Sequence, residues 1–271
     1  EKGVFATRIA YVTKGNGRYT LRITDADGEG GQVPLTSPDP IISPAWSPDG
    51  RELAYVSFET RKAVIWVQDM ASGTRRQVAN YKGTNSAPAW SPDGRELAVT
   101  LSRDGGSQIF MMGRDGSNAR RVSQGSAINT EATFAPDGKT LYFVSDRGGS
   151  PQIYKQAVAG GNAERVTFSG SYNISPDISP DGRTLAFVQR QGGGAFKVMT
   201  MDLASGNTQS VSDTSDDESP SFSPNGRFII YATRAQGREL LMTTTLDGRI
   251  KTRLLTSGLD IREPVWGPFG R

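Results

Sequence analysis

The sequence predicts an all-β protein built as a six-bladed β-propeller, in which each blade is a four-stranded antiparallel sheet. Three observations predict this fold class: one short phrase recurs at a fixed interval, each interval holds four strand-like runs, and the two chain ends complement each other. Together they predict one domain that spans residues 1–271.

The recurring phrase is a proline-glycine turn that returns every 44 residues. Its six copies are SPDG (47–50 and 91–94), APDG (135–138), SPDG (179–182), SPNG (223–226) and GPFG (267–270). A period of about 40–45 residues with several short strands per unit is typical of propellers. Proline presets φ and glycine accepts a positive φ, so each copy predicts a tight hairpin. The D-x-D-x-D-G spacing of a calcium loop is absent, which favours an architectural role.

Each unit contains four runs that we interpret as strands. In the first complete unit they cover residues 43–46, 53–57, 64–69 and 75–79, and later units repeat them down to a last fourth run at 252–256. The two middle runs are apolar on both faces, so neighbouring blades must cover both sides. The fourth run is polar and is expected at the wet outer edge, where charge discourages aggregation.

The chain ends predict how the ring closes. Residues 7–36 align with strands two to four of the next unit, so the first blade lacks its innermost strand. The run REPVWGP (262–268) resembles an innermost strand and has no blade of its own. We therefore expect this C-terminal strand to join the N-terminal blade, which closes the propeller and removes free sheet edges.

Composition excludes several function classes. The chain has no cysteine and no histidine, so disulfides, thiolate metal sites, Ser-His-Asp triads and the usual zinc sites cannot be built. The formal charge is only +3, and the basic residues occur in pairs and not in one stripe, which argues against nucleic acid as a partner. No apolar run approaches the roughly 18 residues of a membrane helix, so no direct membrane insertion is expected. The chain has no initiator methionine or leader, which suits a mature or trimmed piece.

Function is expected where the repeats differ. Aligning the units isolates three columns just before the innermost strands, which we expect to ring one mouth of the axial channel. The first column holds Ile41, Asn85, Asn129, Asn173, Asp217 and Ile261. The second holds Ile42, Ser86, Thr130, Ile174, Glu218 and Arg262. The third holds Ser43, Ala87, Glu131, Ser175, Ser219 and Glu263.

The first column predicts a wreath of amide and carboxylate groups. Such groups can grip the backbone of an inserted peptide, coordinate a hard cation, or merely satisfy one another and bind channel water. The acidic run 213–218 leads into the same mouth and predicts a negative lip together with Glu131 and Glu263. Carboxylate pairs can also serve glycoside chemistry, although no pair stands out here.

At this point the chain resembles a known family. The SPAWSPDG-type repeats, TRIAYV (7–12), APAWSPDG (87–94) and NTEATFAPDG (129–138) resemble the propeller of TolB, a periplasmic component of the Tol–Pal system. The resemblance implies a non-enzymatic protein with no required cofactor, which binds the lipoprotein Pal at the channel mouth and supports outer-membrane integrity and cell division. Colicin translocation domains are implied as competing partners.

The family's Pal-contacting stretches match Thr84 to Ala87 and Asn129 to Glu131. With the mouth columns they give the candidate partner-binding set: Thr84, Asn85, Ser86, Ala87, Asn129, Thr130, Glu131, Asn173, Asp217, Glu218, Arg262 and Glu263. Some family members carry histidine where this chain has Thr84. Calcium in the channel is compatible with the family, with Glu131, Asp217, Glu218 and Glu263 as candidate ligands. The family's N-terminal α/β domain and TolA-binding tail are absent from these residues, so no TolA contact is expected.

Two alternatives stay open. Similar repeats occur in the propellers of prolyl-oligopeptidase-like hydrolases, where the propeller controls substrate entry to a catalytic domain. A lyase or glycosidase that uses only Asp, Glu, Tyr and Arg is a further possibility, although the absence of histidine removes the commonest general base.

Overall fold

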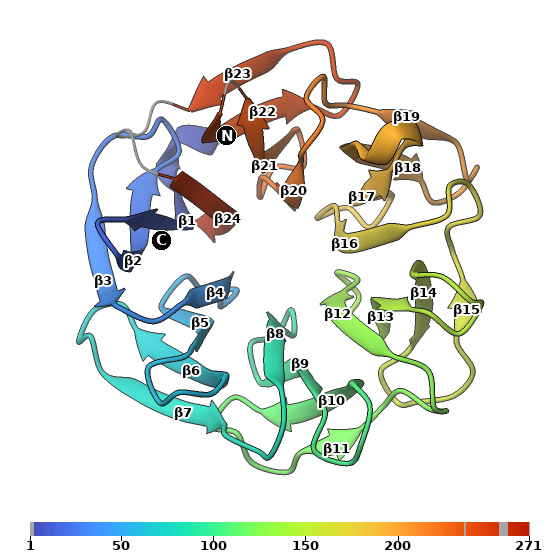
Figure 1. Ribbon diagram of the computed structural model, residues 1–271, viewed down its shortest axis with the longest axis horizontal. Coiled ribbons are helices and arrows are strands. Elements are labelled where there is room, and N and C mark those ends of the chain that lie inside the picture. Colours follow the sequence, from blue (N-terminus) through green and yellow to red (C-terminus); the bar gives the residue numbers. More distant parts are fainter. Residues whose placement is uncertain (1–2, 236, 255–259, 271) are drawn as a thin grey trace.

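The computed structural model describes residues 3–235, 237–254 and 260–270. Its strands form six separate four-stranded antiparallel sheets, and the sheets stand as blades around a central axis (Figure 1). The predicted six-bladed propeller is therefore confirmed. Blade 1 combines both chain ends, and blades 2 to 6 follow in sequence order around the ring.

The innermost strand of each blade faces the axis. From blade 1 to blade 6 these strands are β24 (Asp260–Phe269), β4 (Ile41–Trp46), β8 (Asn85–Trp90), β12 (Asn129–Phe134), β16 (Asn173–Ile178) and β20 (Glu218–Phe222). Each runs from one face of the ring to the other, and those of blades 2 to 6 end at the repeated turn. β24 instead continues through the sixth copy to Phe269, so the prediction that this copy also forms a hairpin is wrong. We call the face where these strands begin the mouth face, and the face with the repeated turns the turn face.

The two middle strands carry most of the buried apolar side chains. The second strands are β1 (Thr7–Gly15), β5 (Glu52–Ser57), β9 (Glu96–Leu101), β13 (Thr140–Ser145), β17 (Thr184–Arg190) and β21 (Phe228–Ala235). The third strands are β2 (Arg18–Asp25), β6 (Val64–Asp69), β10 (Gln108–Gly113), β14 (Gln152–Ala157), β18 (Phe196–Asp202) and β22 (Arg238–Thr245). Every residue of β5 is buried, as expected for a strand covered on both faces.

The outermost strands are short and polar. They are β3 (Gln32–Ser37), β7 (Arg75–Ala79), β11 (Arg120–Arg121), β15 (Glu164–Arg165), β19 (Thr208–Ser210) and β23 (Lys251–Leu254). The predicted end of the last run, at 255–256, lies outside the described residues. Two short 3₁₀ turns, η1 (Val4–Ala6) and η2 (Gly192–Gly194), complete the assignment. In the described ranges no helix is long and apolar enough to cross a membrane.

Blade 1 closes the ring as predicted. β24 pairs antiparallel with β1, with Ile9 opposite Trp266 and Ala10 opposite Val265. The Trp266 indole N–H donates to the Thr7 hydroxyl at 2.8 Å, which fixes the same pairing from a side chain. The two ends of the chain are therefore joined through a continuous sheet.

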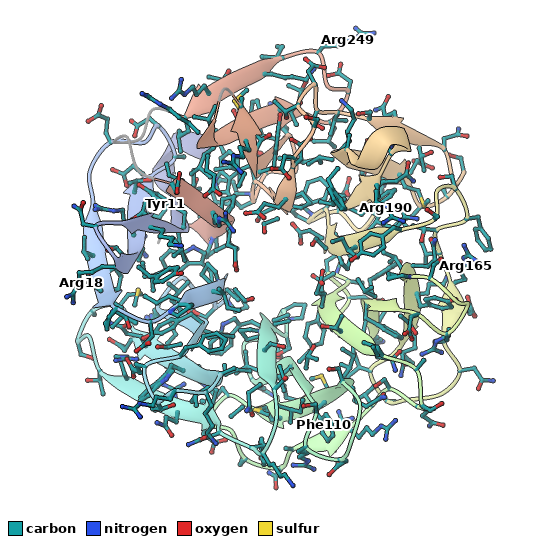
Figure 2. The ribbon with its side chains drawn as sticks, viewed as in Figure 1. Tyr11, Arg18, Phe110, Arg165, Arg190 and Arg249 are labelled. Atoms are coloured by element: carbon teal, nitrogen blue, oxygen red, sulfur yellow. The ribbon has the colours of Figure 1, made fainter. Side chains whose placement is uncertain are left out.

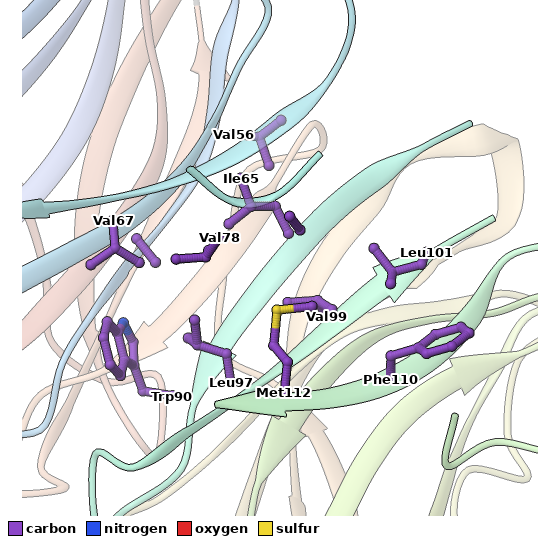
Figure 3. Close-up of a cluster of buried hydrophobic side chains, with 12 residues drawn as sticks. Val56, Ile65, Val67, Val78, Trp90, Leu97, Val99, Leu101, Phe110 and Met112 are labelled. Atoms are coloured by element: carbon purple, nitrogen blue, oxygen red, sulfur yellow. The ribbon is translucent and has the colours of Figure 1, made fainter. Parts of the chain in front are cut away.

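The core lies between blades and not within a single layer. Figure 2 shows Tyr11 and Phe110 within the blades, whereas Arg18, Arg165 and Arg249 lie toward the periphery. One representative cluster joins blade 2, through Val56, Ile65, Val67 and Val78, to blade 3 (Figure 3). Five further clusters join the other neighbouring blades. Each blade is thus stabilised by apolar burial against the next.

The repeated turn is held by its own side chains. In blade 3, the Ser91 hydroxyl donates to Asp93 at 2.6 Å and accepts the Glu96 N–H at 3.0 Å, and Asp93 also accepts the Arg95 N–H. Three other turns repeat this network, with Asn225 in place of aspartate in blade 6. Blade 4 has Ala135 in place of serine, and its Asp137 accepts two backbone N–H groups instead.

Successive turns also pack against one another. A Cβ placed on Gly94 would lie 3.6 Å from Pro48 of the preceding blade, and one on Gly182 would lie 3.2 Å from Pro136. The turn between β10 and β11 is tighter still, because a Cβ on Gly116 would lie 2.3 Å from the carbonyl oxygen of Val78 in blade 2. The repeated phrase therefore connects blades as well as strands.

Candidate functional site

The innermost strands enclose a central channel with a cavity of about 520 Å³. All six blades line it, mainly through serine, proline and alanine, together with three tryptophans. Among the described residues, the charged ones that line the channel are three acids, Glu131, Asp177 and Glu263, and none is basic. The channel is therefore a polar, acidic passage between six strands.

A bulge at the start of each innermost strand shapes the mouth of this channel. All six residues of the third column have positive φ, between 49° and 54°, although none is glycine. Strand pairing is interrupted there, for example between Ile42 and Ala45 in blade 2. Such a bulge turns the backbone locally and changes which way side chains and N–H groups point. Positive φ at a non-glycine residue is uncommon and clusters at functional sites.

Two glutamates of the third column connect blades at the bulges. Glu131 accepts hydrogen bonds from the N–H (2.7 Å) and the hydroxyl of Ser175 in the next blade. Glu263 likewise accepts the N–H of Ser43. The two glutamates lie on β12 and β24, on opposite sides of the ring (Figure 1). Both glutamates therefore line the channel and also form hydrogen bonds that connect adjacent blades.

Burial raises the pKa of all three channel acids. Loss of hydration on burial raises the pKa of Glu131 and brings the pKa of Glu263 to about 7. Burial also raises the pKa of Asp177 to about 6, although its carboxylate accepts the Phe222 N–H at 2.7 Å and the Ile178 N–H at 3.1 Å. All three channel acids therefore hold their protons more tightly than a hydrated carboxyl group does.

The prediction that the first column forms an open wreath around the mouth is wrong. Asn85 is fully buried and begins the strand β8. Its amide nitrogen donates to the carbonyl oxygens of Ala63, Tyr81 and Gly83, and its carbonyl accepts the Tyr81 N–H. The side chain is directed toward the preceding blade 2, where it fastens the incoming loop to the innermost strand β8.

Asn129 and Asn173 are fully buried in the same way. Asn129 donates to Gln108 and Ala127 and accepts from Arg147 at 2.8 Å. Asn173 donates to Gln152 and Ser169 and accepts from Gln189. Neither amide is available to an incoming peptide.

Asp217 occupies the same buried position with different partners. Its side chain accepts hydrogen bonds from the hydroxyls of Ser212, Thr214 and Thr233, because a carboxylate can only accept. Its place in the predicted negative lip is therefore also wrong, since only 2% of the residue is exposed. Ile41 and Ile261 complete the column as buried core residues.

The second column and its neighbours are reachable from the mouth face. Thr84 and Arg262 are exposed, and Ser86, Ala87, Thr130 and Glu218 are partly buried. Arg262 forms an ion pair with Glu239, and burial raises the pKa of Glu218 despite the nearby Arg262 guanidinium. The accessible part of the candidate set is thus smaller than the sequence predicted.

The four calcium candidates do not form a common ligand set. Glu131 and Glu263 lie on opposite sides of the ring, and three hydroxyls surround Asp217. In the described part of the chain, no group of three or more acidic side chains could hold a metal ion. These residues therefore do not fit a calcium site built from them together.

Sequence reasoning missed two features of the site. Asp177 lies in a column that holds Ala45, Ala89, Thr133, Ser221 and Val265 in the other blades. The loop 166–172 exposes Phe168 beside the mouth face. Both are departures from the repeat, so extending the comparison of units beyond three columns would have revealed them.

A closed six-bladed β-propeller with an acidic axial channel and a variable mouth face defines the class of this protein. The sequence profile of the TolB beta propeller domain family (PD40) matches residues 1–270, so the chain belongs to that family. The sequence resemblance is thereby confirmed.

Related proteins agree with this assignment. Tol-Pal system protein TolB of Polaromonas naphthalenivorans is 64% identical over 87 residues, which is 32% of this chain and 20% of that protein. The crystal structure of TolB from Acinetobacter baumannii superposes with a TM-score of 0.93 at 44% identity, over 98% of this chain and 68% of that one. A prolyl endopeptidase structure reaches a TM-score of 0.59 at 15% identity, over 94% of this chain and 44% of that one, which shows a shared fold alone.

Proposed function

We propose that this propeller is a protein-docking domain of the Tol–Pal system and that its mouth face binds Pal, the peptidoglycan-associated lipoprotein. The observation that carries the proposal is membership of the TolB propeller family over almost the whole chain. A rigid ring with exposed, non-repeated side chains on one face suits recognition of a folded partner. Function in the periplasm, in outer-membrane integrity and in cell division follows from the same proposal.

The docking surface comprises the accessible mouth residues. They are Thr84, Ser86, Ala87, Thr130, Glu218 and Arg262. The buried Asn85, Asn129, Asn173 and Asp217 contribute indirectly, by fixing the loops that present their neighbours. Colicin translocation domains would compete for this surface, and we assign no TolA contact to these residues. Catalysis is not part of the proposed role.

A titration of this chain with purified Pal tests the proposal, with Thr84→Arg as the probe. Thr84 is exposed on the mouth face, so a long cation there should obstruct a closely packed interface and weaken binding by about tenfold or more. Thr74→Arg is the matched control, because Thr74 is exposed on the turn face of the adjacent blade 2. Absence of Pal binding by the unmodified chain would refute the proposal, and equal loss in both variants would remove the mouth from it.

A further inference from the structure

The loop between β15 and β16 presents an exposed aromatic side chain on the mouth face. Phe168 is 74% exposed, the largest value among the exposed large apolar residues that the structure describes. The equivalent positions in neighbouring units hold Asn80, Gln124 and Asp213. A phenylalanine placed in solvent where the repeat otherwise has polar residues is a feature that the fold does not require.

This loop is held rigidly. The Gln152 amide donates to the Gly170 carbonyl at 3.1 Å, and the Asn173 and Gln189 amides both donate to the Ser169 carbonyl. Gly170 has a φ of 73°, and a Cβ there would lie 2.7 Å from the Gln189 amide, so the backbone lies directly on blade 5. Phe168 is therefore presented by an ordered loop, which lowers the entropy cost of using it as a contact.

Two arginines lie beside aromatic rings of this region, Arg165 at Phe168 and Arg190 at Tyr172. The Arg165 guanidinium lies 5.2 Å from the Phe168 ring centroid, and that of Arg190 lies 5.2 Å from the Tyr172 ring. Tyr172 also makes an edge-to-face contact with Phe196, with ring centroids 6.1 Å apart. Among the described residues neither arginine is in an ion pair with a carboxylate. The Arg165 Nε–H donates to the Thr167 carbonyl at 2.6 Å, and in the part of the chain that the structure describes neither positive charge is neutralised by an ion pair.

These residues lie on β15, on the loop that follows it and on blade 5, between the rim and the mouth. Figure 2 shows Arg165 at the outer edge of the ring and Arg190 closer to the axis. Tyr172 directly precedes the innermost strand β16, and Phe196 forms a bridge with Asp216 at the end of the acidic run. We call Arg165, Phe168, Tyr172, Arg190 and Phe196 the aromatic track. It adjoins the proposed docking surface without sharing a residue with it.

We propose that the aromatic track is a second contact site for the protein partner that docks at the mouth. This inference rests on the proposed function. It would receive a partner segment in which carboxylate side chains flank an apolar or aromatic one. The apolar side chain packs on Phe168, and the carboxylates pair with Arg165 and Arg190. Aromatic residues and arginine are the residues enriched among the strongest contacts of protein interfaces, and charge-assisted bonds to arginine select for carboxylates.

The test is a titration with Pal of the unmodified chain, Phe168→Ser and Ile250→Ser. Ile250 is 63% exposed in a turn on the turn face, so its substitution removes a similar apolar side chain away from the track. Phe168→Ser should raise Kd by about tenfold or more, the range found for buried aromatic anchors, and Ile250→Ser should leave Kd unchanged. Both positions are exposed, so thermal unfolding should confirm that both variants fold.

The charges are tested separately with Arg190→Gln and Arg249→Gln. Arg249 is exposed on the turn face, where it pairs with Asp247. Arg190→Gln should weaken binding about threefold to tenfold and make it less sensitive to salt, because a partner carboxylate loses its cation. Arg249→Gln should change neither quantity.

The outcomes separate the two proposals. Unchanged Pal affinity in Phe168→Ser and Arg190→Gln, with loss of affinity in Thr84→Arg, overturns the aromatic track and leaves the mouth proposal intact. Absence of Pal binding by the unmodified chain overturns both. Phe168-dependent binding to anionic phospholipid vesicles, with unchanged Pal affinity, would assign the track to a lipid surface and also overturn the inference.

Discussion

The turn face and the channel both carry carboxylates, and the two sets respond to the fold in opposite ways. On the turn face, a hydrogen bond from the Ser91 hydroxyl and then one from the Arg95 N–H lower the pKa of Asp93. In the channel, burial raises the pKa of Asp177 to about 6 even though two N–H groups bond to it. Solvent access explains the difference, because the turn aspartate keeps its hydration and the channel aspartate loses it.

The turn aspartates stabilise the architecture of the ring, whereas the channel acids give individual blades different chemical properties. The turn network recurs with nearly the same partners in four blades, which is what a shared structural duty requires. Asp177 occurs in one blade, and the glutamates Glu131 and Glu263 occur in two. The other blades hold serine, alanine, threonine or valine at these positions. Uniform positions therefore maintain the architecture, whereas the departures give the mouth and channel their individual chemistry.

The largest expected effect on stability lies in the first column, where Asn85 and Asp217 occupy equivalent buried positions. Exchanging the two residue types tests whether these positions are chemically equivalent. Asn85→Asp would place a buried charge against three carbonyl oxygens and should lower the free energy of unfolding by about 3–5 kcal/mol. Asp217→Asn should cost less, about 1–2 kcal/mol, because the surrounding hydroxyls can rotate to accept or donate. Urea unfolding of both variants measures the contrast. Similar losses would mean that the two sites are not chemically distinct.

A second prediction concerns the packing of the turn face. Gly116→Ala should destabilise the protein by about 2–4 kcal/mol, because the new methyl group would meet the Val78 carbonyl and φ is 87°. Gly73→Ala is the control at the corresponding turn of blade 2, with φ of 73° and nothing within 4 Å, and should cost about 1 kcal/mol. Thermal unfolding compares the two. Equal losses would show that only backbone strain matters there and that contact between blades does not.

A third prediction uses the channel acids. Because folding raises the pKa of Asp177 from 3.8 to about 6, the folded state holds this proton more tightly than the unfolded state. Its contribution to stability is therefore greatest below pH 3.8, declines as the pH rises, and is lowest above about pH 6. Asp177→Asn should remove this decline and increase stability at pH 7.5 by about 1–2 kcal/mol.

Unfolding measured between about pH 2 and pH 8 tests this prediction, with Asp93→Asn as the control. Asp93 has a lowered pKa, so its stabilising contribution is present above its ordinary pKa of 3.8 and is lost as the pH falls. The two substitutions should therefore change the pH profile in opposite directions. Parallel changes would contradict the assignment of burial as the dominant influence in the channel.

The smallest effects concern single turns. Ser91→Ala removes two hydrogen bonds of the turn network and should cost about 1–2 kcal/mol. Ala135→Ser in blade 4 introduces the serine that four other turns use and should stabilise the protein by about 0.5 kcal/mol. Differential scanning calorimetry resolves both signs. A destabilising Ala135→Ser would indicate that the Asp137 bonds already replace the missing hydroxyl.

The fold could be predicted from sequence because its information is periodic. A constant interval of 44 residues, runs that are apolar on both faces, and complementary chain ends each constrain the same ring. Periodicity also gave the correct partner strand for residues 262–268, since β24 pairs with β1 as expected. No detailed side-chain information was needed for these conclusions.

The candidate site was only partly predictable, because side-chain direction depends on the bulge. Asn85 and Ser86 are adjacent in the sequence, yet the first is fully buried and the second is partly accessible. Alternation along a strand places neighbouring side chains on opposite sides, and the positive φ at Ala87 then resets the direction. The sequence pattern of a column of asparagines is the same whether the side chains face the channel or the adjoining loop. Sequence alone therefore could not distinguish these two orientations.

The pairing of β24 with β1 joins segments separated by almost the whole chain. Contacts of such long sequence separation form late, since the entropy of closing the loop must be overcome before they contribute. Arg262 and Glu263 reach the channel entrance through β24, so the binding surface and the last step of folding are coupled. A slow final phase in refolding should therefore coincide with the appearance of partner-binding competence.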